Sequence, residues 1–332
     1  MEAAYRANET RKFYEKVNHS RGYCVPQAGA CTDAEGNLLA NEREVIERWK
    51  QFYETHFNGG TTAHEGGIGA TLGDRGHDDM FLAPSLNEVQ EEIKRLRNNK
   101  AAGNDQIPCE LLKYCGETLA NTLHWTICRI WEGEELPQEW MEGVVWPIYK
   151  KGDKLECSNY RPITVLNTAY KILSQLLFRR LSPLAKDFVG SYQAGFTDSR
   201  ATTDQIFALQ QILQKCREYN VPTHHLFIDF KAAYDSIDRE ELWQIMHEYG
   251  FLNKLTRLIK ATVQRVVCYV RVSGVLSNPF ESRKGLRQGD GSSCLLFNIA
   301  LEGVIRRAAK TVQLISFADD IDIIARNLRN YQ

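Results

Sequence analysis

The chain has 332 residues, including nine cysteines, and 41 Lys+Arg against 42 Asp+Glu leave a net charge of −1. With 43% apolar and 25% charged residues, its composition is that of a globular protein with a sizeable core. No apolar run approaches the roughly 18 to 20 residues of a membrane-spanning helix, and the polar start MEAAYRANETRKFYEK argues against a signal or transit peptide. The cysteines are therefore expected to be reduced intracellular thiols, and no Cys-x-x-Cys pair offers a zinc site.

Charge is distributed unevenly along the chain. Residues 1–140 hold 15 Lys+Arg and 23 Asp+Glu, a net charge of −8, whereas residues 141–332 hold 26 and 19, a net charge of +7. A basic C-terminal part is typical of a surface that binds a polyanion, although charge also drifts along chains without any such role.

Helical spacing of apolar residues predicts an N-terminal helix over residues 42–57, with Val45, Trp49, Phe52 and Tyr53 on its apolar face. The glycine-rich residues 59–76 follow, and we expect them to form a linker or disordered loop. Four residues in or beside this stretch could bind a metal, namely His64, His77, Asp78 and Asp79. We expect them to belong to a solvated loop instead.

Helices and strands alternate after Pro84. Ser85 and Glu88 form the S-x-x-E pattern of a capping box at the start of a helix. Apolar periodicity predicts further helices over residues 109–132, 168–181 and 201–218, and a strand over 144–149 that leads into a basic turn at 150–153.

The C-terminal part combines hairpins with one long helix. Residues 226–230 are a short apolar run that contains an acid, and alternation over 266–275 predicts a strand whose hairpin continues into Phe280. A helix capped by Ser292 or Ser293 is expected to run to about residue 310, and residues 314–325 are expected to form two strands joined by a tight turn. Helices interleaved with hairpins predict an α+β fold around an antiparallel sheet.

Acidic residues interrupt two of these apolar segments. Asp229 lies in HHLFIDF, and Asp319 and Asp320 lie in LISFADDIDII. Carboxylates at the ends of buried strands are costly to desolvate and repel one another, and divalent cations with oxygen ligands relieve both effects. The pattern therefore indicates a site for two magnesium ions, roughly 3.5 to 4 Å apart, which suits nucleotidyl transfer. About one Asp-Asp pair is expected by chance in a chain this long, and Asp78-Asp79 fits that description.

From residue 84 onward, six blocks of residues stand out. The first three are residues 100–108 with 110–113 (KAAGNDQIP, ELLK), 146–153 with 159–163 (WPIYKKGD, NYRPI), and 193–196 with Ser199 and Arg200 (QAGF). The other three are residues 229–237 (DFKAAYDSI), 285–290 with 295–298 (GLRQGD, LLFN), and 317–320 (FADD). In this order the blocks resemble those of the reverse transcriptases of non-LTR (LINE-type) retrotransposons, and the last three look like polymerase motifs A, B and C. Together they are far more specific than any one of them.

The resemblance implies a right-hand polymerase fold of class α+β, with fingers and a partial palm on an antiparallel sheet, and with the thumb missing. It implies an N-terminal helical region with its glycine-rich linker at residues 1–83. Fingers and the first part of the palm are expected at 84–222, and the palm with motifs A, B and C at 223–332. Because the chain ends twelve residues after Asp320, we expect a polymerase truncated at both ends.

Carried over to this sequence, the resemblance implies an RNA-directed DNA polymerase that transfers dNTPs onto a primer 3′-hydroxyl. Asp229, Asp319 and Asp320 become the catalytic, metal-binding acids, and Phe230 offers a backbone carbonyl to a metal. Two Mg²⁺ ions are the implied cofactor, and Mn²⁺ also accepts such ligands. The implied partners are an RNA template, a DNA primer and dNTPs at an intracellular, for this family nuclear, location. No membrane association is expected, and the oligomeric state stays open.

The resemblance also implies a dNTP-binding set. Tyr234 matches the aromatic residue that excludes a 2′-hydroxyl, with a core tyrosine as the alternative. Lys150 or Lys151, together with Arg161, match cations that hold the triphosphate, a role that suits a guanidinium; a solvated turn is the alternative for the lysines. Gln288 and Gly289 match the motif B loop, where glycine lets the backbone approach the nascent base pair closely.

The remaining polar residues near these motifs are expected to have other roles. We expect structural or solvated roles for Asp235, Asp238, Asp290 and Asp322, and template-side or structural roles for Gln193 and Arg200. The sequence departs from the family at residues 291–294 (GSSC in place of Pro-x-Ser-Pro), which loosens a loop, and at 104–106 (NDQ in place of Pro-Asp-Gly). Two alternatives therefore remain, a catalytically inactive remnant that at most binds nucleic acid, and a maturase of the group II intron type, which FADD and YRPI fit less well.

Overall fold

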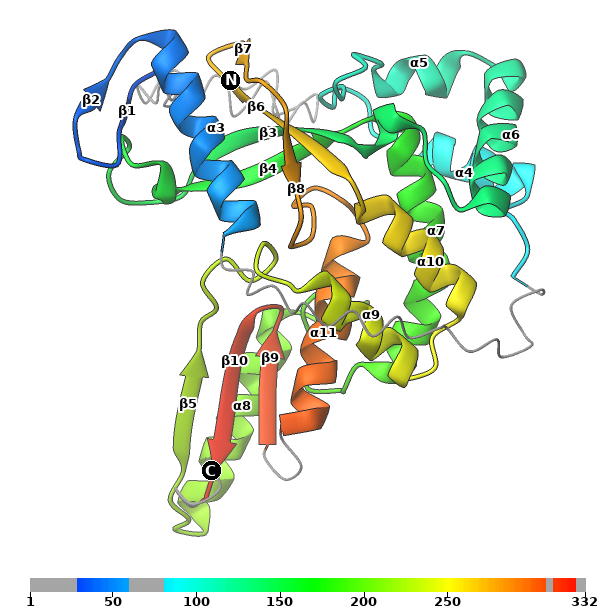
Figure 1. Ribbon diagram of the computed structural model, residues 1–332. Coiled ribbons are helices and arrows are strands. Elements are labelled where there is room, and N and C mark those ends of the chain that lie inside the picture. The colour runs from blue at the N-terminus through cyan, green and yellow to red at the C-terminus, as the bar shows by residue number, and fades with distance from the viewer. Residues whose placement is uncertain (1–28, 60–80, 309–312, 327–332) are drawn as a thin grey trace, which may run out of the picture.

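The structure is a computed structural model that describes residues 29–59, 81–308 and 313–326 (Figure 1). Most of the glycine-rich stretch lies outside these ranges, as do His64, His77, Asp78 and Asp79. In the described ranges, no helix combines the length and the apolar character needed to cross a bilayer.

The strands form two main sheets and one short hairpin. The hairpin pairs β1 (Cys31–Thr32) with β2 (Leu38–Leu39). The larger sheet has the order β4-β3-β6-β7, with β8 also paired to β6. Its strands are β3 (Glu142–Tyr149), β4 (Tyr160–Leu166), β6 (Val266–Val272), β7 (Val275–Leu276) and β8 (Phe280–Ser282). The smaller sheet has the order β5-β10-β9, from β5 (His224–Ile228), β9 (Gln313–Phe317) and β10 (Asp320–Ala325).

Helices pack around both sheets and join them. They are α3 (Glu42–Asn58), α4 (Leu86–Arg95), α5 (Cys109–Tyr114), α6 (Glu117–Gly133), α7 (Thr168–Phe188), α8 (Thr202–Glu218), α9 (Arg239–Glu248), α10 (Asn253–Val263) and α11 (Ser293–Ala308). Short 3₁₀ helices lie at Gln138–Met141 and Cys157–Asn159.

One face of the larger sheet is covered by α3. The side chain of Asn41 caps this helix by accepting a hydrogen bond from the Arg43 amide at 3.0 Å. Trp49 and Tyr53 are fully buried and share one apolar cluster with valines of β3 and β6. Because side chains alternate along a strand, Arg161 of β4 projects from the opposite face, which α3 leaves open.

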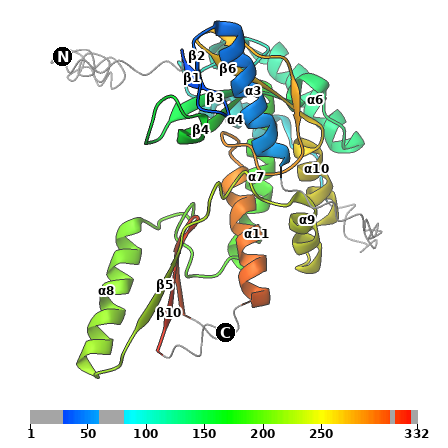
Figure 2. The same ribbon diagram turned by 60° about the vertical axis from the view of Figure 1, so that its left-hand side comes forward.

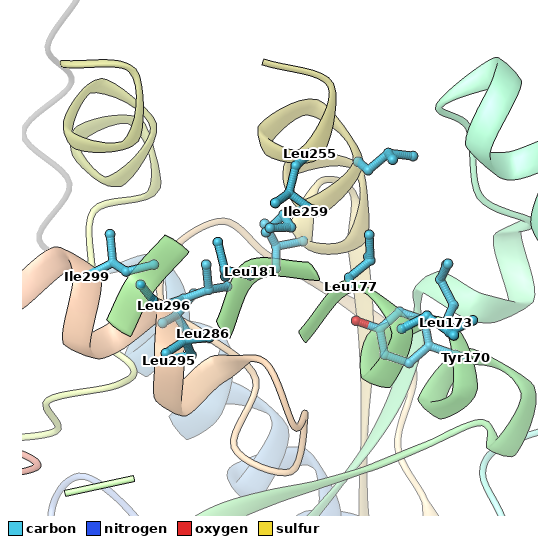
Figure 3. Packing of buried hydrophobic residues seen from close by; sticks show 14 of the residues in the cluster. Tyr170, Leu173, Leu177, Leu181, Leu255, Ile259, Leu286, Leu295, Leu296 and Ile299 are labelled. Carbon is cyan, nitrogen blue, oxygen red and sulfur yellow. The ribbon is translucent and has the colours of Figure 1, made fainter. Parts of the chain in front are cut away.

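The main core surrounds α7. Its leucines at 173, 177 and 181 meet Leu255 and Ile259 of α10 and Leu296 and Ile299 of α11 (Figure 3). Burial of one such side chain contributes about 1.5 to 3 kcal/mol, so this cluster dominates the packing. Since α7 directly follows β4, the cluster fixes the larger sheet relative to α11.

The smaller sheet lies between α8 and α11 (Figure 2). Ile321 and Ile323 of β10 face the main core that includes α11, and α8 packs against β9 on the other side. All neighbouring strands of this sheet are antiparallel, as predicted. The larger sheet differs from the prediction because β3 and β6 pair in parallel.

Most predicted elements are present, with two corrected boundaries. The helix predicted over 109–132 is divided into α5 and α6 because Gly116 adopts φ +82°, a conformation that a helix cannot contain. The helix predicted over 168–181 continues to Phe188 although Pro183 removes one backbone donor. Buried Leu181 and Ala185 flank the proline and hold this last segment in the core.

Candidate active site

The three predicted catalytic acids lie at one end of the smaller sheet. Asp229 directly follows β5, Asp320 begins β10, and Asp319 lies in the two-residue turn between β9 and β10. Ile321 pairs with Ile228, so the register continued by one residue sets Asp320 opposite Asp229. Asp229 and Asp320 are exposed, and Asp319 is half-buried. Two segments about ninety residues apart in sequence thus bring their acids to the same edge because the strands are antiparallel neighbours.

Gln193 holds the turn that carries Asp319. Its Nε2 donates to the carbonyl of Ala318 at 3.0 Å, and its Oε1 accepts from the amide of Ala318 at 2.8 Å. Ala318 has φ +56°, which is uncommon for a residue with a side chain, so these two bonds stabilise a conformation that the chain would not favour alone. Gly195 approaches the same turn so closely that a Cβ there would lie 2.1 Å from the amide nitrogen of Ala318.

These contacts decide between the two roles expected for Gln193. The side chain is only 3% exposed, so it acts as a structural support of the motif C turn. Arg200 likewise donates to the carbonyl of Ser191 at 2.9 Å, a contact within its own loop. The support of Asp319 by Gln193 is not visible in the sequence, because 125 positions separate Gln193 from Ala318.

The donor chemistry at this edge suits a divalent cation. Carboxylate oxygens are the ligands that Mg²⁺ and Mn²⁺ prefer, and exposure of Asp229 and Asp320 leaves their oxygens accessible. Within the described ranges, however, no three His, Cys, Asp or Glu side chains are gathered in a group that could hold a metal ion. Metal binding by these acids therefore stays a prediction.

The other four acids near the motifs make structural contacts, as predicted. Asp238 caps α9 by accepting from the amides of Glu240 and Glu241. Asp322 accepts from Nδ1 of His225 at 2.9 Å. Buried Asp290 accepts hydrogen bonds from several hydroxyls, those of Tyr170, Ser174 and Ser292. Buried Asp235 contacts His56 and Gln288.

Tyr234 lies close to the acidic edge. Its ring stacks on Phe297 of α11 with centroids 4.7 Å apart, and Phe196 meets it edge-on at 6.5 Å. Burial raises the pKa of Tyr234, and the neighbouring Cys294 and Asp319 raise it further. The phenol therefore stays protonated. Its ring is held in position beside Asp319 by the contacts with Phe297 and Phe196.

The motif B loop is fastened to the larger sheet at Gln288 and Gly289. The amide of Thr164 in β4 donates to the carbonyl of Gln288 at 2.7 Å. Gly289 has φ +128°, and a Cβ there would lie 2.2 Å from the carbonyl oxygen of Thr164. Only glycine permits this approach to β4, and the predicted contact of Gly289 with a base pair stays a prediction.

The predicted triphosphate cations lie on the hairpin of β3 and β4. Lys150 and Lys151 are exposed in the turn, where the Lys150 amide donates to the carbonyl of Asn159 at 2.9 Å. Arg161 is exposed opposite Ile148 on the face that α3 does not cover. The structure thus places all three cations on one hairpin, accessible to an anion.

A model of the family described as "Reverse transcriptase (RNA-dependent DNA polymerase)" matches residues 148–332, which include the hairpin turn and all three acids. The solved telomerase of Candida albicans, in complex with a fragment of telomeric RNA, is similar at a TM-score of 0.42 and 14% identity. The similarity covers 63% of this chain and 43% of the telomerase chain.

Curated relatives extend the similarity toward the N-terminus. The transposon TX1 149 kDa protein of Xenopus laevis is 23% identical over 90% of this chain and 24% of its own length. The probable RNA-directed DNA polymerase from transposon BS of Drosophila melanogaster is 24% identical over 89% of this chain and 35% of its own length. The Pol polyprotein of the type-1 retrotransposable element R2 of Popillia japonica is 22% identical over 58% of this chain and 28% of its own length. The chain thus spans between about a quarter and a third of the length of these relatives, which are proteins of transposons and of a type-1 retrotransposable element. It belongs to the family described as reverse transcriptase (RNA-dependent DNA polymerase).

Proposed function

We propose that this chain carries the polymerase site of an RNA-directed DNA polymerase, which adds dNTPs to a primer 3′-hydroxyl along an RNA template. The observation that carries the proposal is the convergence of Asp229, Asp319 and Asp320 at one edge of an antiparallel sheet, in a chain of the reverse transcriptase family. A carboxylate edge of this kind has no role in packing, because two of its three members are exposed.

In this proposal the smaller sheet with α8 and α11 is the palm, and the β3–β4 hairpin belongs to the fingers. The ranges 1–83, 84–222 and 223–332 then correspond to the N-terminal helical region, the fingers with the first palm elements, and the remaining palm. β6 of the last range pairs with β3, and β8 pairs with β6, so the fingers sheet draws strands from both later ranges.

Asp229, Asp319 and Asp320 are the residues that would hold divalent cations, with the carbonyl of Phe230 beside them. Bound there, two cations would lower the pKa of the primer hydroxyl and stabilise charge on the phosphate under attack. The chain itself supplies rigidity, because Gln193 fixes the turn before Asp319 through both polar groups of the Ala318 backbone. Lys150, Lys151 and Arg161 would hold the triphosphate, with Arg161 able to bond two phosphate oxygens at once.

A primer-extension assay with the 332-residue chain tests this function. An RNA template annealed to a labelled DNA primer, with dNTPs and Mg²⁺ or Mn²⁺, is expected to give extension whose products depend on the template sequence. Omission of the metal, or addition of EDTA, is expected to abolish it. Binding of the primer–template without extension in either metal would contradict the proposal and would support the alternative of an inactive remnant that binds nucleic acid.

Replacement of Tyr234 by alanine is expected to raise incorporation of rNTPs relative to dNTPs by about 10- to 200-fold, the range in which loss of a steric contact changes selectivity. The physical reason is that the ring, fixed by Phe297 and Phe196, would no longer occupy the space beside the 2′ position of the sugar. Single-nucleotide extension with matched rNTP and dNTP measures the ratio. Tyr234→Phe keeps the ring and should keep the wild-type ratio, so equal discrimination by all three proteins would assign Tyr234 to the core instead.

A further inference from the structure

The C-terminal end of α3 is attached to the segment that leads into motif B. Asn58 donates from Nδ2 to the carbonyl of Glu281 at 2.7 Å and accepts from the amide of Arg283 at 3.0 Å. The amide of Lys284 donates to the carbonyl of Phe57 at 3.3 Å. Figure 1 shows this end of α3 beside β8, immediately before the loop of motif B. Residues more than 220 positions apart are therefore held together directly next to the proposed site.

Within this junction, His56 contacts a buried acid of motif A. Nε2 of His56 lies 3.0 Å from Oδ2 of Asp235, whose side chain is only 4% exposed. A carboxylate only accepts hydrogen bonds, so the ring nitrogen of His56 is the donor. The ring of His56 also stacks on Phe52 one turn earlier in α3, with centroids 5.9 Å apart. The donor is thus presented in a fixed direction.

The same carboxylate oxygen holds the side chain of Gln288. Nε2 of Gln288 donates to Oδ2 of Asp235 at 2.8 Å, while the backbone carbonyl of Gln288 accepts from Thr164 at 2.7 Å. Because Asp235 cannot donate, the amide of Gln288 must turn its NH₂ group toward Asp235 and its carbonyl oxygen away. Asp235 thus selects one of the two orientations of the Gln288 amide.

The position of Asp235 is itself constrained by the motif B loop. Gly285 has φ +74°, and a Cβ there would lie 2.6 Å from the carbonyl oxygen of Asp235. The amides of Gly285 and Leu286 donate to the carbonyls of Ile237 and Tyr234 at 2.8 and 2.9 Å. The turn after β5 and the motif B loop therefore form one unit, and the side chain of His56 in α3 donates a hydrogen bond to it.

We propose that His56 is a positioning residue for nucleotide binding: it holds the carboxylate of Asp235, and through it the amide of Gln288, in the orientation that faces the incoming dNTP. The inference rests on the proposed polymerase function. On this inference, α3 contributes to nucleotide binding, although it precedes the region matched by the reverse transcriptase family model. The ligand that this network serves is the sugar and base of a dNTP, since the triphosphate is assigned to the cations of the β3–β4 hairpin.

The test is steady-state primer extension with His56→Phe, which keeps an aromatic ring against Phe52 but removes the donor. The KM for dNTP is expected to rise about tenfold, the effect of losing one hydrogen bond to a charged group, while kcat stays within about twofold of wild type. His56→Gln restores an N–H donor and is expected to recover most of the KM. This split between KM and kcat, with rescue by the amide, is not expected of a residue that only stabilises the fold.

Asn58→Ala serves as the matched control, because it removes contacts between α3 and β8 without touching Asp235. Its KM is expected to equal that of wild type, and circular dichroism should show that all three variants are folded. An unchanged KM in a folded His56→Phe protein, or an equal rise in Asn58→Ala, would overturn the role of His56 while leaving the polymerase function intact. Absence of extension by the wild-type chain would instead refute the proposed function itself, so the two failures are distinct.

Discussion

Replacement of Asp319 by asparagine is expected to lower the rate constant of primer extension by about 1,000-fold or more. Asparagine keeps the shape of the side chain but removes the negative charge that would bind a divalent cation, and metal-assisted charge stabilisation contributes several kcal/mol to such reactions. The turn should survive the change, because Gln193 holds it through the backbone of Ala318 rather than through Asp319. Single-turnover extension with saturating dNTP and Mg²⁺ measures the effect.

Asp322→Asn is the matched control for this experiment. Asp322 lies in β10, two residues after Asp320. It is buried and accepts a hydrogen bond from Nδ1 of His225 at 2.9 Å. Its replacement is expected to lower the free energy of unfolding by about 1 kcal/mol but to leave the extension rate within about threefold of wild type. If Asp322→Asn lost as much activity as Asp319→Asn, the special role of the acidic edge would be refuted.

The largest expected effect on stability comes from Arg239, at the start of α9. This buried guanidinium donates to the backbone carbonyls of Gly285, Val263, Ser282 and Lys284 at 2.8, 2.7, 2.9 and 3.1 Å. Burial lowers the pKa of Arg239 to about 10, with the nearby charge of Arg287 adding to the effect. The group remains protonated at neutral pH, and it joins α10, β8 and the motif B loop at one point.

Arg239→Met is expected to lower the free energy of unfolding by about 3 to 5 kcal/mol, because a methionine fills similar space but leaves several buried carbonyls without a donor. Urea denaturation followed by circular dichroism measures the change. Arg217→Met, on an exposed position of α8, is the control and should change stability by less than about 0.5 kcal/mol. A loss below about 1 kcal/mol for Arg239→Met would show that water replaces the guanidinium at these carbonyls.

Local sequence patterns were sufficient to predict most of the helices and strands. The capping box at Ser85 and Glu88 starts α4 as predicted, and the apolar residues on both sides of Asp319 and Asp320 form β9 and β10, joined by a two-residue turn. These features depend on side chains within a few residues of one another, so periodicity and capping patterns report them directly. The extension of α7 through Pro183 was not predictable in this way, since burial in the core compensates for the lost donor.

The sequence by itself therefore determined the class of the protein and the order of its motifs, and it predicted which acids form the candidate site, because each of these depends on residue types at short spacing. Only the tertiary structure decided which residues support them. Gln193 meets the turn before Asp319, and His56 meets Asp235, across 125 and 179 positions. Such contacts arise from the way helices and sheets pack, and a local pattern carries no information about a partner that packing brings from the other end of the chain.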